Sequence, residues 1–285
     1  MTTHDAGPAS TPRVWLITGA SSGFGRAIAN AALAGGDIVV ATARRPETLD
    51  DLVAEYPQRA QAVALDVTAM HAAAVVDDVV ARYGRIDVLV NNAGRTQVGA
   101  LEETTDQELR YLFELHFFGP AALVRAVLPH MRRRGGAVVQ LSSVGGQVTA
   151  PGFGAYCATK FALEGLTETL SQEVDFGVRF LIVEPGAFRT GLFAAGSAYL
   201  SAAMPEYAAT VGPTRAYVSN GDGSQPGDPA KAAAAILTAL AAERTPLRLP
   251  LGGDAVDGIW AHLATVGEEL TTWEPPSRST NFDSS

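Results

Sequence analysis

The stretch Thr18-Gly19-Ala20-Ser21-Ser22-Gly23-Phe24-Gly25 is a glycine-rich turn between two segments of different character. The apolar run before it, residues 14–17, is typical of a buried strand, and residues 25–34 after it are typical of a helix that ends at Gly35-Gly36. Three glycines allow a tight turn, close backbone approach to a pyrophosphate and close packing of helix on sheet. In this context the turn predicts a dinucleotide site at the helix N-terminus.

Outward from this turn, short apolar runs alternate with helical patterns along the chain. We expect further strands at 38–42, 62–65, 88–90, 137–141, 179–183 and 247–249. We expect further helices at 46–56, 69–83 with Thr68 as N-cap, 105–131 opened by the capping box Thr105–Glu108, 156–174 and 228–242. This alternation predicts an α/β doubly wound parallel sheet (Rossmann fold) in three α/β/α layers.

The regularity of the pattern divides the chain into three parts. Residues 1–12 read as a disordered leader and not as a signal peptide, and 13–250 as a single domain. Within that domain the segment 187–227 has no clear period, so we expect an irregular loop there. Residues 251–285 are expected to be a C-terminal extension whose end, from Trp273 to Thr280, is an extended tail.

Composition excludes several classes of protein. Of 285 residues 47% are apolar, enough for a large core, and the apolar runs are far shorter than the roughly 18 residues of a membrane span. The net charge of −9 argues against binding to nucleic acid or a membrane surface. A single cysteine, Cys157, excludes an internal disulfide and a multi-cysteine metal site. We therefore expect a soluble cytoplasmic protein without a metal.

The end of the second expected strand bears on which dinucleotide is bound. A protein that selects NAD usually places an acidic residue there, but this chain has Ala41-Thr42-Ala43-Arg44-Arg45. Guanidinium groups suit a 2′-phosphate, so we expect NADP(H), with Arg44 as the more direct contact; a solvated arginine pair is the alternative. Asp66, after the third strand, is a candidate for the adenine edge or a local cap.

Tyr156 and Lys160 stand one helical turn apart, on one helix face. A lysine ammonium beside a tyrosine is expected to lower the pKa of the phenol, which otherwise lies too high for acid–base work at neutral pH. Lysine is rare in this chain, where Lys231 is the only other one. Ser143 follows the fifth strand and could hydrogen-bond a substrate oxygen, whereas for Ser142 we expect turn capping.

Together these motifs resemble the short-chain dehydrogenase/reductase family in its single-domain branch. The resemblance spans about residues 13–250 and rests on the glycine turn, Asn91-Asn92-Ala93-Gly94, Ser143, Tyr156-x-x-x-Lys160 and Pro185-Gly186 in order and spacing. Residues 154–165 are most similar to the NADP-linked, hydroxysteroid-dehydrogenase-like reductases. The resemblance implies a Rossmann-fold catalytic domain in which 187–227 is the substrate loop.

The resemblance also implies roles for individual residues. Tyr156 would be the general acid/base, Ser143 would polarise the substrate oxygen, and Lys160 would tune Tyr156 and bind ribose. Pro185-Gly186 would lie by the nicotinamide and Thr190 by its carboxamide. The implied cofactor-binding set is Thr18, Gly19, Ser21, Ser22, Gly23, Phe24, Gly25, Arg44, Arg45, Asp66, Val67, Asn92, Ala93, Gly94, Tyr156, Lys160, Pro185, Gly186, Phe188 and Thr190.

One position departs from the family pattern. Where the family often has an asparagine that helps to hold a relay water in the long helix, this chain has His116. One interpretation makes His116 a core histidine with satisfied hydrogen bonds. The other makes it a member of a proton relay, since imidazole titrates near neutral pH.

The leading hypothesis is an NADPH-dependent carbonyl reductase, reversible as an alcohol dehydrogenase. Apolar and aromatic residues in 187–227 favour an apolar or aromatic ketone or alcohol, and no arginine cluster marks a carboxylate or phosphate substrate. The alternatives are an NAD-linked alcohol dehydrogenase and a non-catalytic NADP(H)-sensing protein. The resemblance implies a homodimer or homotetramer through the helices expected at 105–131 and 156–174.

Overall fold

The fold places all but two short strands in one parallel sheet. The computed structural model describes residues 11–194 and 196–282, so residues 1–10 of the expected leader lie outside the described residues. The strands are β1 (Val14–Ile17), β2 (Ile38–Ala43), β3 (Ala60–Ala64), β4 (Val88–Asn91), β5 (Gln97–Val98), β6 (Gly136–Leu141), β7 (Val178–Pro185), β8 (Tyr199–Leu200) and β9 (Arg248–Leu251). β5 and β8 pair separately from the main sheet.

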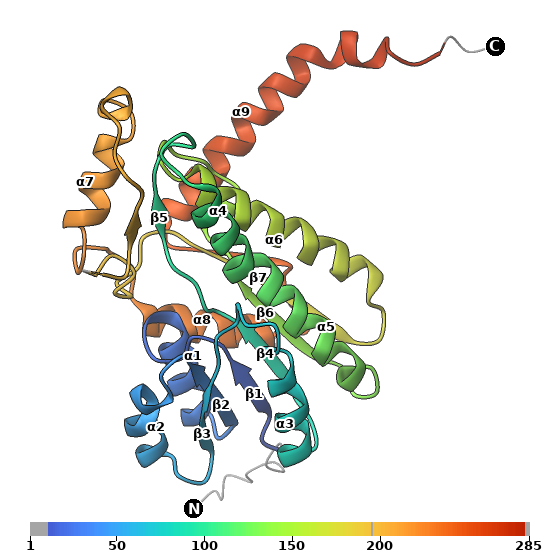
Figure 1. The fold of residues 1–285 in the computed structure, drawn as a ribbon. Helices are drawn as coiled ribbons and strands as arrows, with labels where there is room; N and C mark the ends of the chain where they lie inside the picture. The colour runs from blue at the N-terminus through green and yellow to red at the C-terminus, as the bar shows by residue number, and fades with distance from the viewer. Residues whose placement is uncertain (1–10, 195, 283–285) are drawn as a thin grey trace, which may run out of the picture.

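The helices connect these strands (Figure 1). The α-helices are α1 (Gly23–Ala34), α2 (Asp50–Glu55), α3 (Ala74–Tyr83), α4 (Asp106–Phe113), α5 (Gly119–Met131), α6 (Gly154–Glu173), α7 (Gly212–Asn220), α8 (Pro229–Ala241) and α9 (Gly253–Arg278). Short 3-10 turns lie at Pro46–Leu49, Val144–Gly146 and Pro205–Tyr207, and a π turn lies at Glu114–Phe118.

The main sheet has seven parallel strands in the order β3-β2-β1-β4-β6-β7-β9. The chain runs outward from β1 to β3, returns to β4 on the other side of β1, and then runs outward to β9. This topology confirms the doubly wound fold expected from the sequence. It also creates a switch point between β1 and β4, where ligands of open α/β sheets bind.

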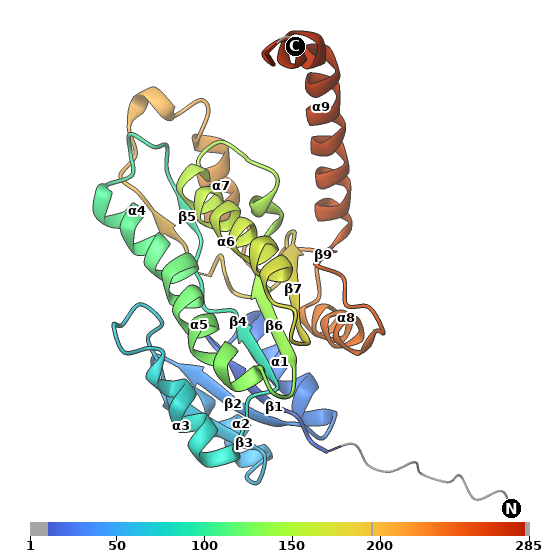
Figure 2. The same cartoon turned by 90° about the vertical axis from the view of Figure 1, so that its right-hand side faces the viewer.

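Alternate residues of the central strands pack into two hydrophobic cores, one on each face of the sheet. In β1, Trp15 and Ile17 pack in the core beneath α1 and α8, and Val14 and Leu16 pack in the core beneath α3 and α5. All of β1 is buried, as expected for a sheet covered on both faces. Figures 1 and 2 show α1, α2 and α8 over one face and α3 to α6 over the other.

Two helix predictions need correction. The helix expected from residue 69 begins at Ala74, because Thr68 donates its backbone N–H and hydroxyl to Asp66 and so does not cap it. The helix expected over 105–131 opens with the predicted capping box at Thr105 but is interrupted by the π turn. Pro120 has no N–H to bond the carbonyl of His116, four residues earlier, so the regular helical register cannot continue there.

The sequence pattern also missed helices in the last third of the chain. Within 187–227, which was expected to be irregular, α7 has a proline in its first turn and only Val218 buried, too little apolar periodicity to reveal it. The tail expected to be extended from Trp273 belongs instead to α9. Pro275 and Pro276 stand near the end of that helix, so the hydrogen bonds they lose leave the preceding turns intact.

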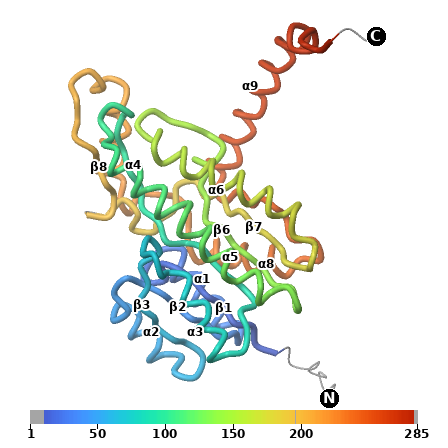
Figure 3. Tube along the Cα trace, turned by 45° about the vertical axis from the view of Figure 1, so that its right-hand side comes forward, coloured from blue at the N-terminus to red at the C-terminus, as the bar shows by residue number. Residues whose placement is uncertain are grey.

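Helix α9 leaves the body of the protein. Its buried residues, Ala255 and Ile259, lie in the first two turns, and residues 263–282 are all exposed. Figures 1 and 2 show a bend near its C-terminal end, where the two prolines stand, and Figure 3 shows the same helix projecting from the body.

One helical stretch in the described part of the chain, Asp106–Met131, is long and apolar enough to cross a membrane by length and composition. This differs from the expectation drawn from short apolar runs. Nearly half of its most apolar window is buried, and α5 packs on β4 and β6. A core helix passes the same test because its inward face is apolar, so the stretch is weak evidence for a span.

A buried carboxyl pair lies beneath the carboxyl ends of β6 and β7. Glu184, fully buried, accepts a hydrogen bond from Gln147, and Arg248 Nε lies 3.2 Å from Glu164 and 3.6 Å from Glu184. Burial raises the pKa of Glu184 to about 7, and the neighbouring Glu164 charge acts in the same direction. The folded protein therefore holds a proton on Glu184 more tightly than the unfolded chain does.

This pair predicts a pH-dependent stability. Because the folded pKa of Glu184 is raised, its stabilising contribution is complete below about pH 4.5 and is lost as the pH rises towards 7. Glu184→Gln imitates the protonated form, so relative to wild type it should gain about 1–2 kcal/mol of unfolding free energy between pH 5 and pH 8, measured by urea denaturation. Glu168→Gln, at the exposed end of the same Arg248 network, is the control. A pH-independent offset between Glu184→Gln and wild type would contradict the prediction.

Candidate active site

A cavity of about 630 Å³ opens at the carboxyl ends of the central strands. The β1–α1 turn, the ends of β2, β4, β6 and β7, helix α6 and residues within 185–193 and 196–199 form its walls. Of the residues expected to bind cofactor, all except Thr18 and Gly25 line it, and so do Ser143 and His116. The structure thus brings together side chains that lie up to about 170 positions apart in the sequence.

The three glycine positions of the turn do not accommodate side chains. Gly19 and Gly23 have φ values of +65° and +57°, which L side chains rarely adopt. A Cβ atom on Gly25 would lie 2.4 Å from both the Asn92 side chain and the Gly19 carbonyl oxygen. The turn leads into α1, whose first turn contains no acidic residue and whose Ser22 makes no side-chain cap. This cradle and the positive end of α1 fit the pyrophosphate of a dinucleotide.

Asn92 ties the end of β4 to this turn. Its side-chain amide donates to the carbonyl oxygens of Thr18 at 2.9 Å and Gly19 at 3.0 Å. The Thr18 hydroxyl oxygen accepts from the backbone N–H groups of Asn92 and Ala93. Thr18 is almost fully buried, so its part in the site is to fix the backbone and not to touch a ligand directly.

The far end of the cavity carries exposed positive charge. Arg44 and Arg45 follow β2, both are exposed, and neither forms an ion pair with a described carboxylate. Asp66 lines the same end, and one of its oxygens accepts from the backbone and hydroxyl of Thr68 at 2.9 and 2.7 Å. Asp66 therefore does act as a local cap, with its second oxygen left for another donor.

Of the two serines after β6, Ser142 does not have the role expected of it. Ser143, not Ser142, caps the short turn that follows, accepting the N–H of Gly145 at 3.0 Å. Ser142 is buried and donates to Glu164 at 2.6 Å. The prediction of turn capping for Ser142 is therefore wrong, because the buried carboxylate of Glu164 takes its hydroxyl. Ser143 keeps its place in the cavity beside Tyr156.

Burial, and not Lys160, controls the acidity of Tyr156. Burial raises the pKa of Tyr156 to about 12, with the Ser143 hydroxyl acting in the opposite direction. Lys160 Nζ donates to the Leu141 carbonyl oxygen at 2.8 Å and lies 5.6 Å from the centre of the Tyr156 ring. Burial also lowers the pKa of Lys160 to about 8. The expectation that Lys160 lowers the tyrosine pKa thus does not hold in this structure, since its ammonium is directed to the β6 carbonyl.

His116 is a buried neutral imidazole with both nitrogens engaged. Its Nε2 accepts the backbone N–H of Arg95 at 3.2 Å, and its Nδ1 lies 2.9 Å from the Thr159 hydroxyl oxygen. That hydroxyl already donates to the Tyr156 carbonyl at 2.7 Å, so Nδ1 must donate to it. Burial lowers the pKa of His116 well below its usual value. These contacts favour a structural histidine over a proton relay.

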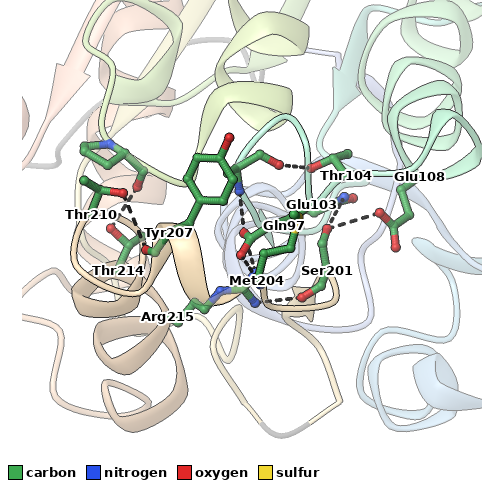
Figure 4. A network of polar contacts seen from close by, with 12 residues as sticks. Gln97, Glu103, Thr104, Glu108, Ser201, Met204, Tyr207, Thr210, Thr214 and Arg215 are labelled. Atoms are coloured by element: carbon green, nitrogen blue, oxygen red, sulfur yellow. Dashed lines mark hydrogen bonds and ion pairs between the residues drawn. The ribbon is translucent and has the colours of Figure 1, made fainter.

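A polar network fastens residues 201–215 to the body (Figure 4). Glu103, buried before α4, accepts the backbone N–H of Met204 at 2.8 Å and pairs with Arg215 at 2.6 Å. Glu108, on the first turn of α4, accepts the Ser201 hydroxyl at 3.1 Å. The carboxyl group of Glu108 thus completes the capping box and also holds β8.

Among the cavity residues, Arg95 and Tyr111 were not assigned to the site from the sequence, and Tyr199 was expected only as one of the aromatic residues of 187–227. Arg95 stands directly after the Asn91–Gly94 motif, a position that could have suggested it. Tyr111 faces the cavity because it lies one turn after Glu108 on α4. Tyr199 reaches it only through the pairing of β8 with β5, which nothing in the sequence indicates.

Comparison with known proteins agrees with this site. The family model described as short chain dehydrogenase matches residues 13–199. An oxidoreductase of Botryotinia fuckeliana, BOA17, is 39% identical over 263 residues, which cover 90% of this chain and 96% of the relative. The solved structure of a short-chain dehydrogenase from Streptomyces avermitilis is 64% identical, with a TM-score of 0.90 over 96% of this chain and 100% of that one.

Two further solved structures contain nicotinamide cofactors. An alcohol dehydrogenase from the archaeon Thermococcus sibiricus, complexed with 5-hydroxy-NADP, is 27% identical with a TM-score of 0.70 and covers 85% of this chain and 96% of that one. A short-chain dehydrogenase/reductase from Burkholderia phymatum, in complex with NAD, is 25% identical with a TM-score of 0.77 and covers 92% and 95%. Fold, cavity and family match together establish that the chain belongs to the short-chain dehydrogenase family of oxidoreductases.

Proposed function

We propose that this protein is an NADPH-dependent carbonyl reductase, reversible as an alcohol dehydrogenase, that acts on an apolar or aromatic ketone. The observation that carries the proposal is one cavity that joins the glycine cradle, a strand end bearing Arg44 and Arg45, and the group Ser143, Tyr156 and Lys160. When bound, the nicotinamide would supply or accept the hydride.

Different residues of the chain would bind the cofactor, polarise the substrate oxygen and transfer the proton. The unpaired arginines after β2 would hold the 2′-phosphate, and the α1 N-terminus would hold the pyrophosphate. Ser143 would donate a hydrogen bond to the substrate oxygen as negative charge develops on it. Tyr156 would deliver a proton to the same oxygen, and Lys160 would position ribose hydroxyls from its place against the Leu141 carbonyl.

The acidity of Tyr156 favours the reductive direction. With its pKa raised to about 12, Tyr156 is protonated at neutral pH, which is the form that a ketone reduction requires. Alcohol oxidation would first require the phenolate. The aromatic side chains of Phe188, Phe193 and Tyr199 on the cavity wall support an apolar or aromatic substrate.

The choice of cofactor can be tested with Arg44→Ala. We expect wild-type protein to bind NADPH more tightly than NADH, and the variant to lose about 10–100-fold in NADPH affinity through the missing charge-assisted hydrogen bond. NADH affinity should change less than about twofold, because NADH has no 2′-phosphate for Arg44 to hold. Nicotinamide fluorescence titration measures both, with Arg82→Ala on the exposed end of α3 as control. Equal binding of both cofactors would instead favour an NAD-linked alcohol dehydrogenase, and no binding of either would remove the proposed function.

The two interpretations of His116 give different kinetics. Since both imidazole nitrogens are used in fixed contacts, His116→Ala should lower turnover several-fold at most. Tyr156→Phe, which removes the proton donor, should lower it by about 10²-fold or more. Steady-state reduction of a ketone panel with NADPH compares the two variants. If His116→Ala is as damaging as Tyr156→Phe while its melting temperature is unchanged, the structural role is wrong.

We also propose that the protein forms a homodimer or homotetramer through α4–α5 and α6. Two exposed phenylalanines on these neighbouring elements support the proposal: Phe118 is 51% and Phe161 is 44% exposed. Phe161→Glu should lower the mass measured by sedimentation, whereas Leu270→Glu, on the exposed part of α9, should not. An unchanged mass in Phe161→Glu would place the interface elsewhere.

A further inference from the structure

The side chain of Arg95 lies in the cavity between two aromatic rings. Its guanidinium carbon is 4.4 Å from the centre of the Tyr111 ring and 4.7 Å from that of the Tyr199 ring, and all three residues line the same wall. Tyr111 comes from α4 and Tyr199 from β8, so the arginine bridges the body and the segment that carries β8. The two rings lie against the planar guanidinium group, so its edge, where the N–H groups point, stays open to a ligand.

The surroundings hold Arg95 in this place. Its backbone N–H is bonded to His116, and Gln97, two residues later, pairs with Tyr199 in the small β5–β8 sheet. The Tyr199 hydroxyl donates to Glu108 at 2.7 Å, which fixes the ring against α4. The guanidinium is therefore positioned before any ligand arrives.

The charge of Arg95 has no partner among the described residues. Its Nε is buried without a hydrogen-bond partner, and no described carboxylate lies within 4 Å of its guanidinium nitrogens. Arg215, by contrast, pairs with Glu103 and also donates to the Ser201 carbonyl oxygen at 2.7 Å. Glu108, which accepts the hydroxyl of the flanking Tyr199, is also engaged by Ser201 and Thr105. A guanidinium kept half-buried and unpaired is costly unless a ligand satisfies it.

We propose that Arg95 binds a carboxylate of the substrate, so that the enzyme acts on ketones that carry a carboxylate group. The inference rests on the proposed carbonyl reductase and names its substrate class. The planar edge of a guanidinium matches a carboxylate with two parallel hydrogen bonds, and the aromatic flanks admit an apolar or aromatic carbon skeleton beside it. A single preorganised arginine would thus bind the carboxylate although the sequence shows no arginine cluster for one.

The test compares acids with neutral compounds of the same shape. The probes are 3- and 4-acetylbenzoate, with 3- and 4-methylacetophenone as their neutral counterparts. Calorimetry in the presence of NADP⁺ measures binding without turnover, and NADPH oxidation measures reduction. We expect wild type to bind at least one acid about 10–100-fold more tightly than its neutral counterpart, in keeping with a charge-assisted pair. Arg95→Met should lose that preference with the neutral ketones changed less than twofold.

Matched variants separate recognition from structure. Arg95→Lys keeps the charge and should retain part of the preference, and Arg110→Met, which removes an exposed charge next to Tyr111, should retain all of it. NADPH affinity and melting temperature should be unchanged in Arg95→Met. An equal loss for acids and neutral ketones would make Arg95 a purely structural bridge and overturn the proposal.

Two further outcomes also overturn it: no acid preference in wild type, or a preference that survives in Arg95→Met. Reduction of the neutral ketones without any acid preference would leave the carbonyl reductase standing and remove only the carboxylate site. Tight, Arg95-dependent binding of an acid that is not reduced would leave the carboxylate site standing and remove the carbonyl reductase.

Discussion

The amide of Asn92 holds together the two halves on which the rest of the structure depends. Chain order reverses between the paired strands β1 and β4, and two hydrogen bonds from Asn92 to Thr18 and Gly19 join the segments that follow them. Gly25 must be glycine because the same amide occupies the space a Cβ would need. The direction of α1, the shape of the cradle and the floor of the cavity all follow from this close approach.

The side of the cavity that carries Ser143 and Pro185 is built on a different kind of support. Ser143 and Pro185 stand next to Ser142 and Glu184, which belong to the buried network of Glu164 and Arg248. The loops that carry Ser143 and Pro185 therefore rest on hydrogen bonds and ion pairs, while the sheet beneath α1 and α8 rests on apolar packing. A polar support of this kind fixes position well, but it couples the site to the protonation of buried carboxyl groups.

Repeating patterns and contacts between residues close in the sequence could be predicted, whereas contacts between residues far apart in the sequence could not. Alternating apolar runs were enough for the doubly wound sheet, and the glycine turn was enough for the cradle. The capping box at Thr105 was correct because its partner is three residues away. The raised pKa of Tyr156 could not be predicted, since it is set by burial, while the Lys160 ammonium is directed to the Leu141 carbonyl. The placement of Arg95 against two rings could not be predicted, because the second ring, that of Tyr199, comes from 104 residues further along the chain.

The last strand of the sheet has a consequence for how the protein behaves at high concentration. Leu247 and Leu251 direct their carbonyl oxygens towards β7. Because successive residues of a strand direct their backbone groups to opposite sides, Pro250 directs its backbone nitrogen towards the outer edge of the sheet. That nitrogen carries no hydrogen and cannot donate to another strand. The edge is thereby a poor template for added strands, so the chain is protected on this side against edge-to-edge aggregation and fibril growth.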